Sequence, residues 1–234
     1  MNVIYEFDAS VLTTATFVAD DSRYNVHEWS MSYLEDLEVR RSLGHLPTLQ
    51  HRWINFEGEL DFRSAEPEPK QALDFVGFSP AADLLGLRDS ALNATNNLWG
   101  LVEVLPLRCR DADYSAIHAT RHYDILDLAN STFRVPRRRD AIITFGSLGI
   151  PKIMGLHTTD VDEVDLFRFP EIPSMFCTQG FLDRLRELGI TGYGARQVWP
   201  PTEEQLAEEA RLLVLQRAGK MHGQMHFRPE ALEA

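Results

Sequence analysis

Residues 166–193 read LFRFPEIPSMFCTQGFLDRLRELGITGY, a short strand followed by the best-marked helix of the chain. The apolar run at residues 166–169 predicts the strand. Thr178 has the side chain of a helix N-cap, and Gly189 can take the left-handed backbone that commonly ends a helix. Between them, one apolar helix face is formed by Phe181, Leu182, Leu185 and Leu188. The stretch therefore predicts a strand and then a helix over residues 181–188.

Short runs with strand character occur upstream at a density that favours an antiparallel sheet. They span residues 2–7, 16–19, 52–56, 74–78, 98–109, 123–128, 132–135, 141–145 and 152–154. We expect residues 16–19 to pair with residues 2–7, and Pro106 to lie at a sheet edge or bulge. A weak helical pattern covers residues 32–43, and Ser79 with Pro80 predicts a helix start that continues to about residue 85.

A further helix follows the prolines at 200 and 201, because Thr202 and Gln205 have the spacing of a capping box. The chain is therefore predicted to be α+β, a central mostly antiparallel sheet with flanking helices and a C-terminal amphipathic helix over residues 202–218. The proline-containing segment 64–70 is the most linker-like stretch. We divide the chain into a divergent N-terminal part (1–70), a central domain (71–200) and a helical extension with a tail (201–234).

Charge and hydropathy limit the classes of partner. Aspartate and glutamate outnumber lysine and arginine by 35 to 23, a formal charge of −12, which disfavours nucleic-acid binding and favours a basic partner. The apolar runs are far shorter than the roughly 18 residues that span a bilayer, and the first residues lack the features of a signal peptide. We therefore expect a cytoplasmic protein that does not bind membranes. Cys109 and Cys177 lack a disulfide or zinc pattern and are predicted to be buried thiols.

No motif in the sequence predicts catalysis, so we assign no catalytic, cofactor-binding or metal-ligating residue. His222 and His226 are four apart, but Gly223 between them disfavours the rigid helix that a metal site would need. The basic segment formed by Arg134 and residues 137–139 is interpreted as a solvated turn. The glycine-containing segments fit neither a dinucleotide fold nor a phosphate loop.

An acidic run is the strongest candidate for binding a partner. It comprises Asp160, Asp162, Glu163 and Asp165, and it lacks the turn glycine and final glutamate of a calcium loop. Exposed carboxylates steer basic proteins toward an encounter. Trp199 is the aromatic candidate for an interface anchor, with burial in the core as the alternative.

Three blocks follow one another from Leu98 onward. LWGLVEVL at residues 98–105 precedes CRDADYS at residues 109–115, and both precede the stretch from Leu166 to Tyr193 with its Phe-Arg and Gly-Ile-Thr-Gly motifs. This order resembles the myxobacterial-type immunity-protein domain found beside bacterial polymorphic toxins. The resemblance covers about half of the chain, is clearest over residues 166–198 and fades before Phe75.

The resemblance implies a non-catalytic cytoplasmic protein that binds and neutralises a cognate toxin by stoichiometric occlusion, and a basic toxin would suit the acidic surface. Two other classes stay open. One is a small metal-dependent hydrolase, for which the nearest local constellation is His118, His122, Asp111 and Asp113. The other is an oligomerisation module in which the helix over residues 202–218 docks on a second copy, making a homo-oligomer.

Overall fold

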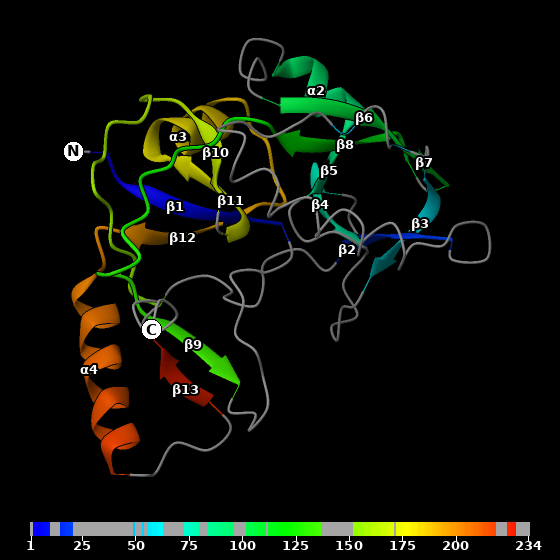
Figure 1. Ribbon diagram of the computed structural model, residues 1–234. Helices are drawn as coiled ribbons and strands as arrows, with labels where there is room; N and C mark the ends of the chain where they lie inside the picture. The colour runs from blue at the N-terminus through cyan, green and yellow to red at the C-terminus, as the bar shows by residue number, and fades with distance from the viewer. Residues whose placement is uncertain are drawn as a thin grey trace.

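The structure is a computed structural model, and it describes only part of the chain. The described residues are 2–9, 15–20, 49, 53, 56–62, 73–79, 84–95, 102–110, 112–136, 152–170, 172–218 and 224–227. Within them, a four-stranded sheet lies beside a seven-stranded sheet, with a two-stranded ladder below the first (Figure 1). The fold is α+β and its strand pairs are mostly antiparallel, as the sequence predicted.

The four-stranded sheet joins the first strand of the chain to strands between residues 166 and 199. Its strands stand in the order β10 (Leu166–Phe169), β11 (Ile172–Thr178), β1 (Ile4–Asp8) and β12 (Gly194–Trp199), and every neighbouring pair is antiparallel. Ile4 at the start of β1 lies opposite Thr178 on one side and Trp199 on the other. The predicted strands at residues 2–7 and 166–169 are confirmed, and they belong to the same sheet.

The seven-stranded sheet is built from strands between residues 15 and 119. Its order is β6 (Val102–Pro106), β8 (Tyr114–Ala119), β5 (Leu85–Arg88), β4 (Phe75–Ser79), β2 (Ala15–Ala19), β3 (Glu57–Phe62) and β7 (Arg108–Cys109). The β2–β4 and β3–β7 pairs are parallel, and the other pairs are antiparallel. Pro106 ends the edge strand β6, which confirms its predicted place at a sheet edge.

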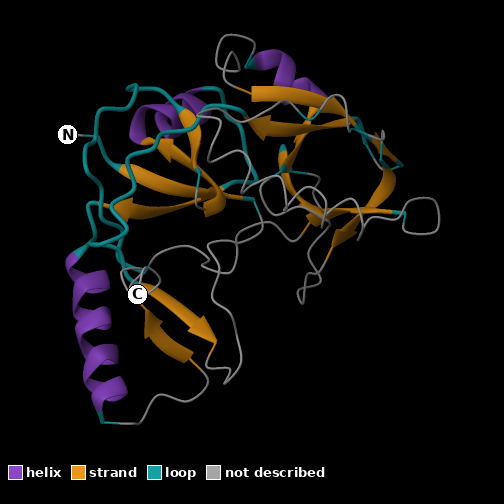
Figure 2. Cartoon of the chain, in the orientation of Figure 1, coloured by secondary structure: helices purple, strands orange, loops and turns teal. Residues whose placement is uncertain are grey.

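Helix α3 packs on one face of the four-stranded sheet, and Figure 2 shows the helices against the strands. Helix α2 (Asp89–Ala94) follows β5, and α3 (Gln179–Glu187) follows β11. Helix α4 (Glu203–Arg217) begins with the predicted capping box, in which Thr202 and Gln205 exchange side-chain and backbone hydrogen bonds. Beside it, β9 (Phe133–Pro136) pairs with β13 (Gln224–Phe227).

Several expectations about local structure are wrong. The helix predicted from Ser79 to about residue 85 is wrong at both ends, because Ser79 ends β4 and Leu85 begins β5; residues 80–83 lie outside the described residues. Residues 16–19 do form a strand, but it pairs with β3 and β4 rather than with β1. The strands expected at 123–128 and 152–154 are only isolated bridges, whereas β8 forms where none was expected. In the segment 52–56, the described Trp53 and Phe56 lie outside any strand, and β3 begins at Glu57.

The segments 32–43 and 141–145, for which a helix and a strand were predicted, lie outside the described residues. The predicted boundary at residue 70 has strands of both sheets on its N-terminal side, namely β1, β2 and β3. The division into residues 1–70, 71–200 and 201–234 stays a prediction. Among the described residues, no helix is long and apolar enough to cross a membrane.

Three apolar clusters hold the elements together. The first lies between the two sheets and α3, where Phe7 of β1 meets Phe75 of β4 edge to face at 5.2 Å and also contacts Phe181 of α3. The second surrounds Phe17 and Phe78 within the seven-stranded sheet. The third lies on the opposite face of the four-stranded sheet, where alternate side chains point away from α3; it includes Ile4, Ile125, Phe167, Phe169 and Phe176.

The end of α3 offers a test of backbone conformation alone. Gly189 has φ +66°, and the amides of Gly189 and Ile190 donate to Arg186 and Leu185 in the pattern of a Schellman motif. No atom lies within 4 Å of the place that a Cβ would take. We expect Gly189→Ala to lower the free energy of unfolding by about 1 kcal/mol, and Gly189→Asn to lower it less, in chemical denaturation. An alanine variant as stable as the wild type would contradict the assigned conformation.

Candidate functional site

The predicted acidic run lies on a pair of adjacent segments that we call the double loop, residues 121–128 and 155–165. Backbone hydrogen bonds join the two segments: Asp127 N donates to Gly155 O at 2.9 Å, and His157 N donates to Ile125 O at 2.9 Å. Leu126 and Leu156 form an antiparallel bridge between them. In Figure 1 these segments run along the outside of the four-stranded sheet, near the N-terminus.

The double loop is fixed to the protein by apolar side chains. Ile125, Leu126 and Val161 are buried in the third cluster, where they meet the outward face of the four-stranded sheet. Asn2 adds a polar link, because its side-chain amide donates to Val161 O at 2.7 Å. Burial of these side chains holds the backbone that carries the exposed acids.

Arg121 is the centre of a polar cluster within the double loop. Its Nη1 donates to Asp165 Oδ2 at 3.0 Å and also to the carboxylate of Asp162. The hydroxyl of Tyr123 donates to the same Asp165 oxygen at 2.6 Å. Asp165 is further tied to the start of α3, since its backbone amide donates to Thr178 Oγ1 at 3.0 Å.

Asp165 therefore requires a correction to the sequence-based assignment of binding residues. It is fully buried, and its Oδ2 is occupied by Arg121 and Tyr123, so it is not available to an external partner. The sequence shows four acids in one run, but the partner that neutralises Asp165 lies 44 residues earlier in the chain. Asp165 positions the loop that presents its neighbours.

Burial raises the pKa of Asp165, against the opposing effect of the hydrogen bonds from Tyr123 and Arg121. Its second oxygen, Oδ1, is buried without a hydrogen-bond partner, which makes the charged form costly. The pKa of Tyr123 is also raised, first by burial and then by its hydrogen bond to Asp165.

The raised pKa of Asp165 has a definite effect on stability. Because the folded state holds this proton more tightly, Asp165 contributes stability that is complete below its usual pKa of 3.8 and is lost as the pH rises through the raised value. Wild type should therefore lose stability relative to Asp165→Asn as the pH rises through this window. Denaturant unfolding at a series of pH values measures the difference.

Asp127 provides a control, because its contribution to stability should change with pH in the opposite direction. A hydrogen bond from the Asn130 side chain lowers the pKa of Asp127, so its contribution is present above its usual pKa and is lost as the pH falls. Relative to Asp127→Asn, wild type should thus gain stability as the pH rises. A difference between wild type and Asp165→Asn that stayed constant, or rose with pH, would contradict the burial argument.

The other acids of the run do face solvent. Asp160, Asp162 and Glu163 are all exposed, and the side chain of Asp162 is 66% accessible although it pairs with Arg121. Asp124, on the neighbouring segment, is exposed as well. Sequence reasoning missed Asp124 because residues 123–128 were assigned to a strand. We call Asp124, Asp160, Asp162 and Glu163 the acidic face.

Trp199 packs against the same apolar cluster that holds the double loop. It ends β12 opposite Ile4, is half-buried and packs against the third cluster. Its Nε1 is buried without a hydrogen-bond partner. A ring that already packs against the core has less area to offer a partner. Its role as an interface anchor stays a prediction.

A second polar network is buried between the two sheets. Arg168 of β10 donates from Nη1 to His118 Nε2 of β8 at 3.1 Å, and His118 Nδ1 lies 3.3 Å from Glu103 Oε2 of β6. Arginine has no acceptor, so Nε2 accepts and Nδ1 carries the hydrogen that points to Glu103. The backbone amide of Leu49 donates to the same carboxylate oxygen at 2.7 Å.

This network includes His118, one of the four residues considered above as the site of a metal-dependent hydrolase. His118 is fully buried, and both of its ring nitrogens face Arg168 and Glu103 rather than another proposed ligand. Asp113 is exposed ahead of β8, and Asp111 lies outside the described residues. Over the described part of the chain, no three His, Cys, Asp or Glu side chains gather so that they could hold a metal ion.

The structure also places several of the cysteine, histidine and arginine residues that the sequence analysis discussed. Cys177 is a buried free thiol whose pKa is raised by burial, and Cys109 is free but only half-buried. Arg134 and His226 lie opposite each other in the β9–β13 ladder. His222 and residues 137–139 lie outside the described residues.

The comparisons with known proteins leave the family open. No known family model matches the sequence, and no curated protein matches it. The resemblance to immunity-protein domains therefore stays a prediction.

Proposed function

We propose that this chain is an immunity protein that binds a basic bacterial toxin and neutralises it by stoichiometric occlusion, without turnover. The observation that carries the proposal is the acidic face, whose carboxylates are exposed on a double loop that is fixed by buried contacts. We place the protein in the cytoplasm of the cell that it protects, where a nucleic-acid-degrading or other basic toxin domain would act.

The double loop suits rapid capture of a basic surface. Electrostatic steering accelerates encounter when charges of one sign are grouped, and the formal charge of −12 adds to the local field. Because Arg121, Tyr123 and Asp165 fix the loop, its carboxylates lose less conformational entropy on binding than those of an unsupported loop would. A stable inhibitory interface of typical size would bury about 1,200–2,000 Å² and so extend beyond the acidic face.

Co-expression with the product of the adjacent gene tests this proposal. We expect the cells to survive the neighbouring toxin, and the two chains to co-purify in a one-to-one complex. Survival without a complex would contradict occlusion and favour enzymatic reversal of the damage. Cell death despite expression of the folded protein would contradict neutralisation of that toxin.

Helix α4 supports a second candidate, self-association. Its Leu206 and Val214 are exposed by 48% and 65%, whereas its buried side chain is the polar Glu209. Docking of α4 on a second copy would cover these apolar side chains. A molar mass that rises with concentration, and that no longer rises in Leu206→Glu with Val214→Glu, would support a homo-oligomer; a monomer at all concentrations would contradict it.

A further inference from the structure

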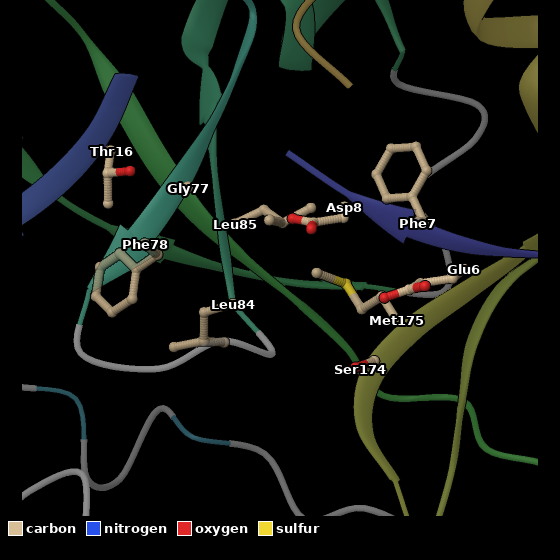
Figure 3. Close-up of a pocket in the computed structure, with 10 residues that line it drawn as sticks. All are labelled: Glu6, Phe7, Asp8, Thr16, Gly77, Phe78, Leu84, Leu85, Ser174 and Met175. Atoms are coloured by element: carbon tan, nitrogen blue, oxygen red, sulfur yellow. The ribbon is translucent and has the colours of Figure 1, made fainter. Parts of the chain in front are cut away.

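Among the described residues that line the pocket between the two sheets, no charge is unmet. The pocket has a volume of about 300 Å³ and lies between β1 and β11 on one side and β2, β4 and the start of β5 on the other (Figure 3). Of its two carboxylates, Glu6 accepts from Arg196 Nε and Nη2 at 2.8 and 2.6 Å, and Asp8 has a partner as well. The exposed side of helix α4 is a stronger candidate for binding.

Helix α4 turns apolar side chains toward solvent. Leu206 and Val214 are exposed by 48% and 65%, and Ala210 between them is exposed as well. The three residues follow one another at intervals of four, so their side chains share one face of the helix. We call Leu206, Ala210 and Val214 the α4 ridge. In Figure 1, α4 lies outside the two large sheets and beside the β9–β13 ladder.

The side of α4 that contacts the rest of the protein is held by polar groups. Gln205 Nε2 donates to Gln197 O at 2.7 Å, and Thr132 Oγ1 donates to Glu209 Oε1 at 3.5 Å. Glu209 is only 5% exposed. A surface helix normally turns its apolar residues to the core and its polar residues to water. The α4 ridge departs from this pattern, which indicates a surface that a partner covers.

Two free charges stand at the ends of the α4 ridge. Glu203 precedes Leu206 by three positions, and Arg217 follows Val214 by three positions, so both charges fall on the face of the ridge. Both side chains are exposed, and neither has an ionic partner among the described residues. This face of α4 therefore carries, in order, an acid, three apolar side chains and a base.

We propose that α4 packs against α4 of a second copy in antiparallel orientation, with a two-fold axis at Ala210. The axis brings Leu206 of each copy against Val214 of the other. It also brings Glu203 of each copy to Arg217 of the other, so the free charges pair at both ends. The small side chain of Ala210 at the crossing lets the helix axes approach to about 8–10 Å.

Charge and size define the pair further. In a parallel pair Glu203 would meet Glu203 and Arg217 would meet Arg217, so like charges disfavour that orientation. Helix α4 has 15 residues and is therefore about 22 Å long, and a strip about 10 Å wide along it is smaller than the roughly 800 Å² per partner of a standard interface. We expect a weak dimer, with a dissociation constant on the order of ten to a hundred micromolar. The proposal rests on self-association, the second candidate function, and not on binding of a toxin.

Sedimentation equilibrium of the full chain, with charge variants of α4, tests the pairing. Glu203→Lys alone and Arg217→Glu alone should each weaken the dimer about tenfold, because the two-fold axis turns both ion pairs into like-charge contacts. The double variant with both substitutions restores opposite charges at both ends and keeps the net charge of the wild type, so it should recover the affinity.

Glu204→Lys is the matched control. Glu204 is an exposed acid of the same first turn, its substitution changes the net charge as Glu203→Lys does, and its side chain lies about 100° further round the helix. It should leave the dissociation constant within about twofold of the wild type. Ala210→Arg puts two like charges at the axis and should abolish the dimer. Circular dichroism checks that each variant is folded.

The outcomes separate this pairing from self-association in general. A wild type that stays monomeric up to about 1 mM, far above the expected dissociation constant, would overturn the pairing and the self-association candidate together. A dimer that both single charge variants leave unchanged, or that the double variant does not restore, would overturn the antiparallel pairing alone. A folded Ala210→Arg protein that still forms the dimer would do the same.

Discussion

Replacing Arg168 by methionine is expected to lower the free energy of unfolding by about 3–5 kcal/mol, the typical cost of removing one partner from a buried charged network. Arg168 is 1% exposed, and its Nη1 donates to His118 across the junction of the two sheets. Methionine fills much of the volume, but it leaves His118 Nε2 without its arginine donor, on the ring whose Nδ1 faces Glu103. Urea denaturation measures the loss.

The matched control for this prediction is Arg184→Met on α3. Arg184 is exposed and pairs with Glu187 at 2.8 Å, and such surface pairs contribute at most about 1 kcal/mol. A double-mutant cycle of Arg168→Met with Glu103→Gln adds a second readout. If both residues belong to one network, the double variant should lose less free energy of unfolding than the two single variants lose in sum. An Arg168→Met protein as stable as the Arg184→Met protein would contradict a network that joins the sheets.

Reversing the charge of Asp160, Asp162 and Glu163 to lysine should slow association with a basic toxin by about tenfold or more at low salt. The exposed carboxylates act at long range, so the effect appears in the association rate more than in the dissociation rate. The difference in association rate between wild type and variant should shrink as added salt shortens the Debye length, which is about 8 Å at physiological ionic strength. Stopped-flow mixing at several salt concentrations measures the rate.

A control with the same change in net charge separates local steering from overall charge. Glu187, Glu203 and Glu204 are exposed acids of α3 and α4 that are not part of the double loop. Reversing these three should slow association much less than reversing the three acids of the double loop. Equal slowing by both triple variants would contradict the acidic face as the contact surface and leave only a net-charge effect.

Local signals in the sequence were enough to predict the start of α4 and the end of α3, where specific residues mark the helix boundary. The Thr202 and Gln205 pair predicted the capping box of α4, and Gly189 predicted the left-handed end of α3. Such signals act over a few residues and need no knowledge of the fold. The Ser79 and Pro80 signal was wrong at the two described ends of the expected helix, because Ser79 ends β4 and Leu85 begins β5, and tertiary pairing overrides local propensity.

Contacts between distant parts of the chain could not be predicted in the same way. β1 lies between two strands that follow it by more than 160 residues, and nothing in residues 2–7 specifies those partners. Asp165 has the same side chain as Asp160, yet one is buried on Arg121 and the other is exposed. Burial of a charged residue depends on a partner that only the fold brings near.

The central claim is stoichiometric neutralisation, and titration of toxin activity with the purified protein tests it most directly. With toxin concentration well above the dissociation constant, activity should fall linearly and reach zero at one molar equivalent of this protein. Inhibition that grows with time at much less than one equivalent would contradict occlusion and indicate turnover, and undiminished activity at a large excess would contradict neutralisation itself.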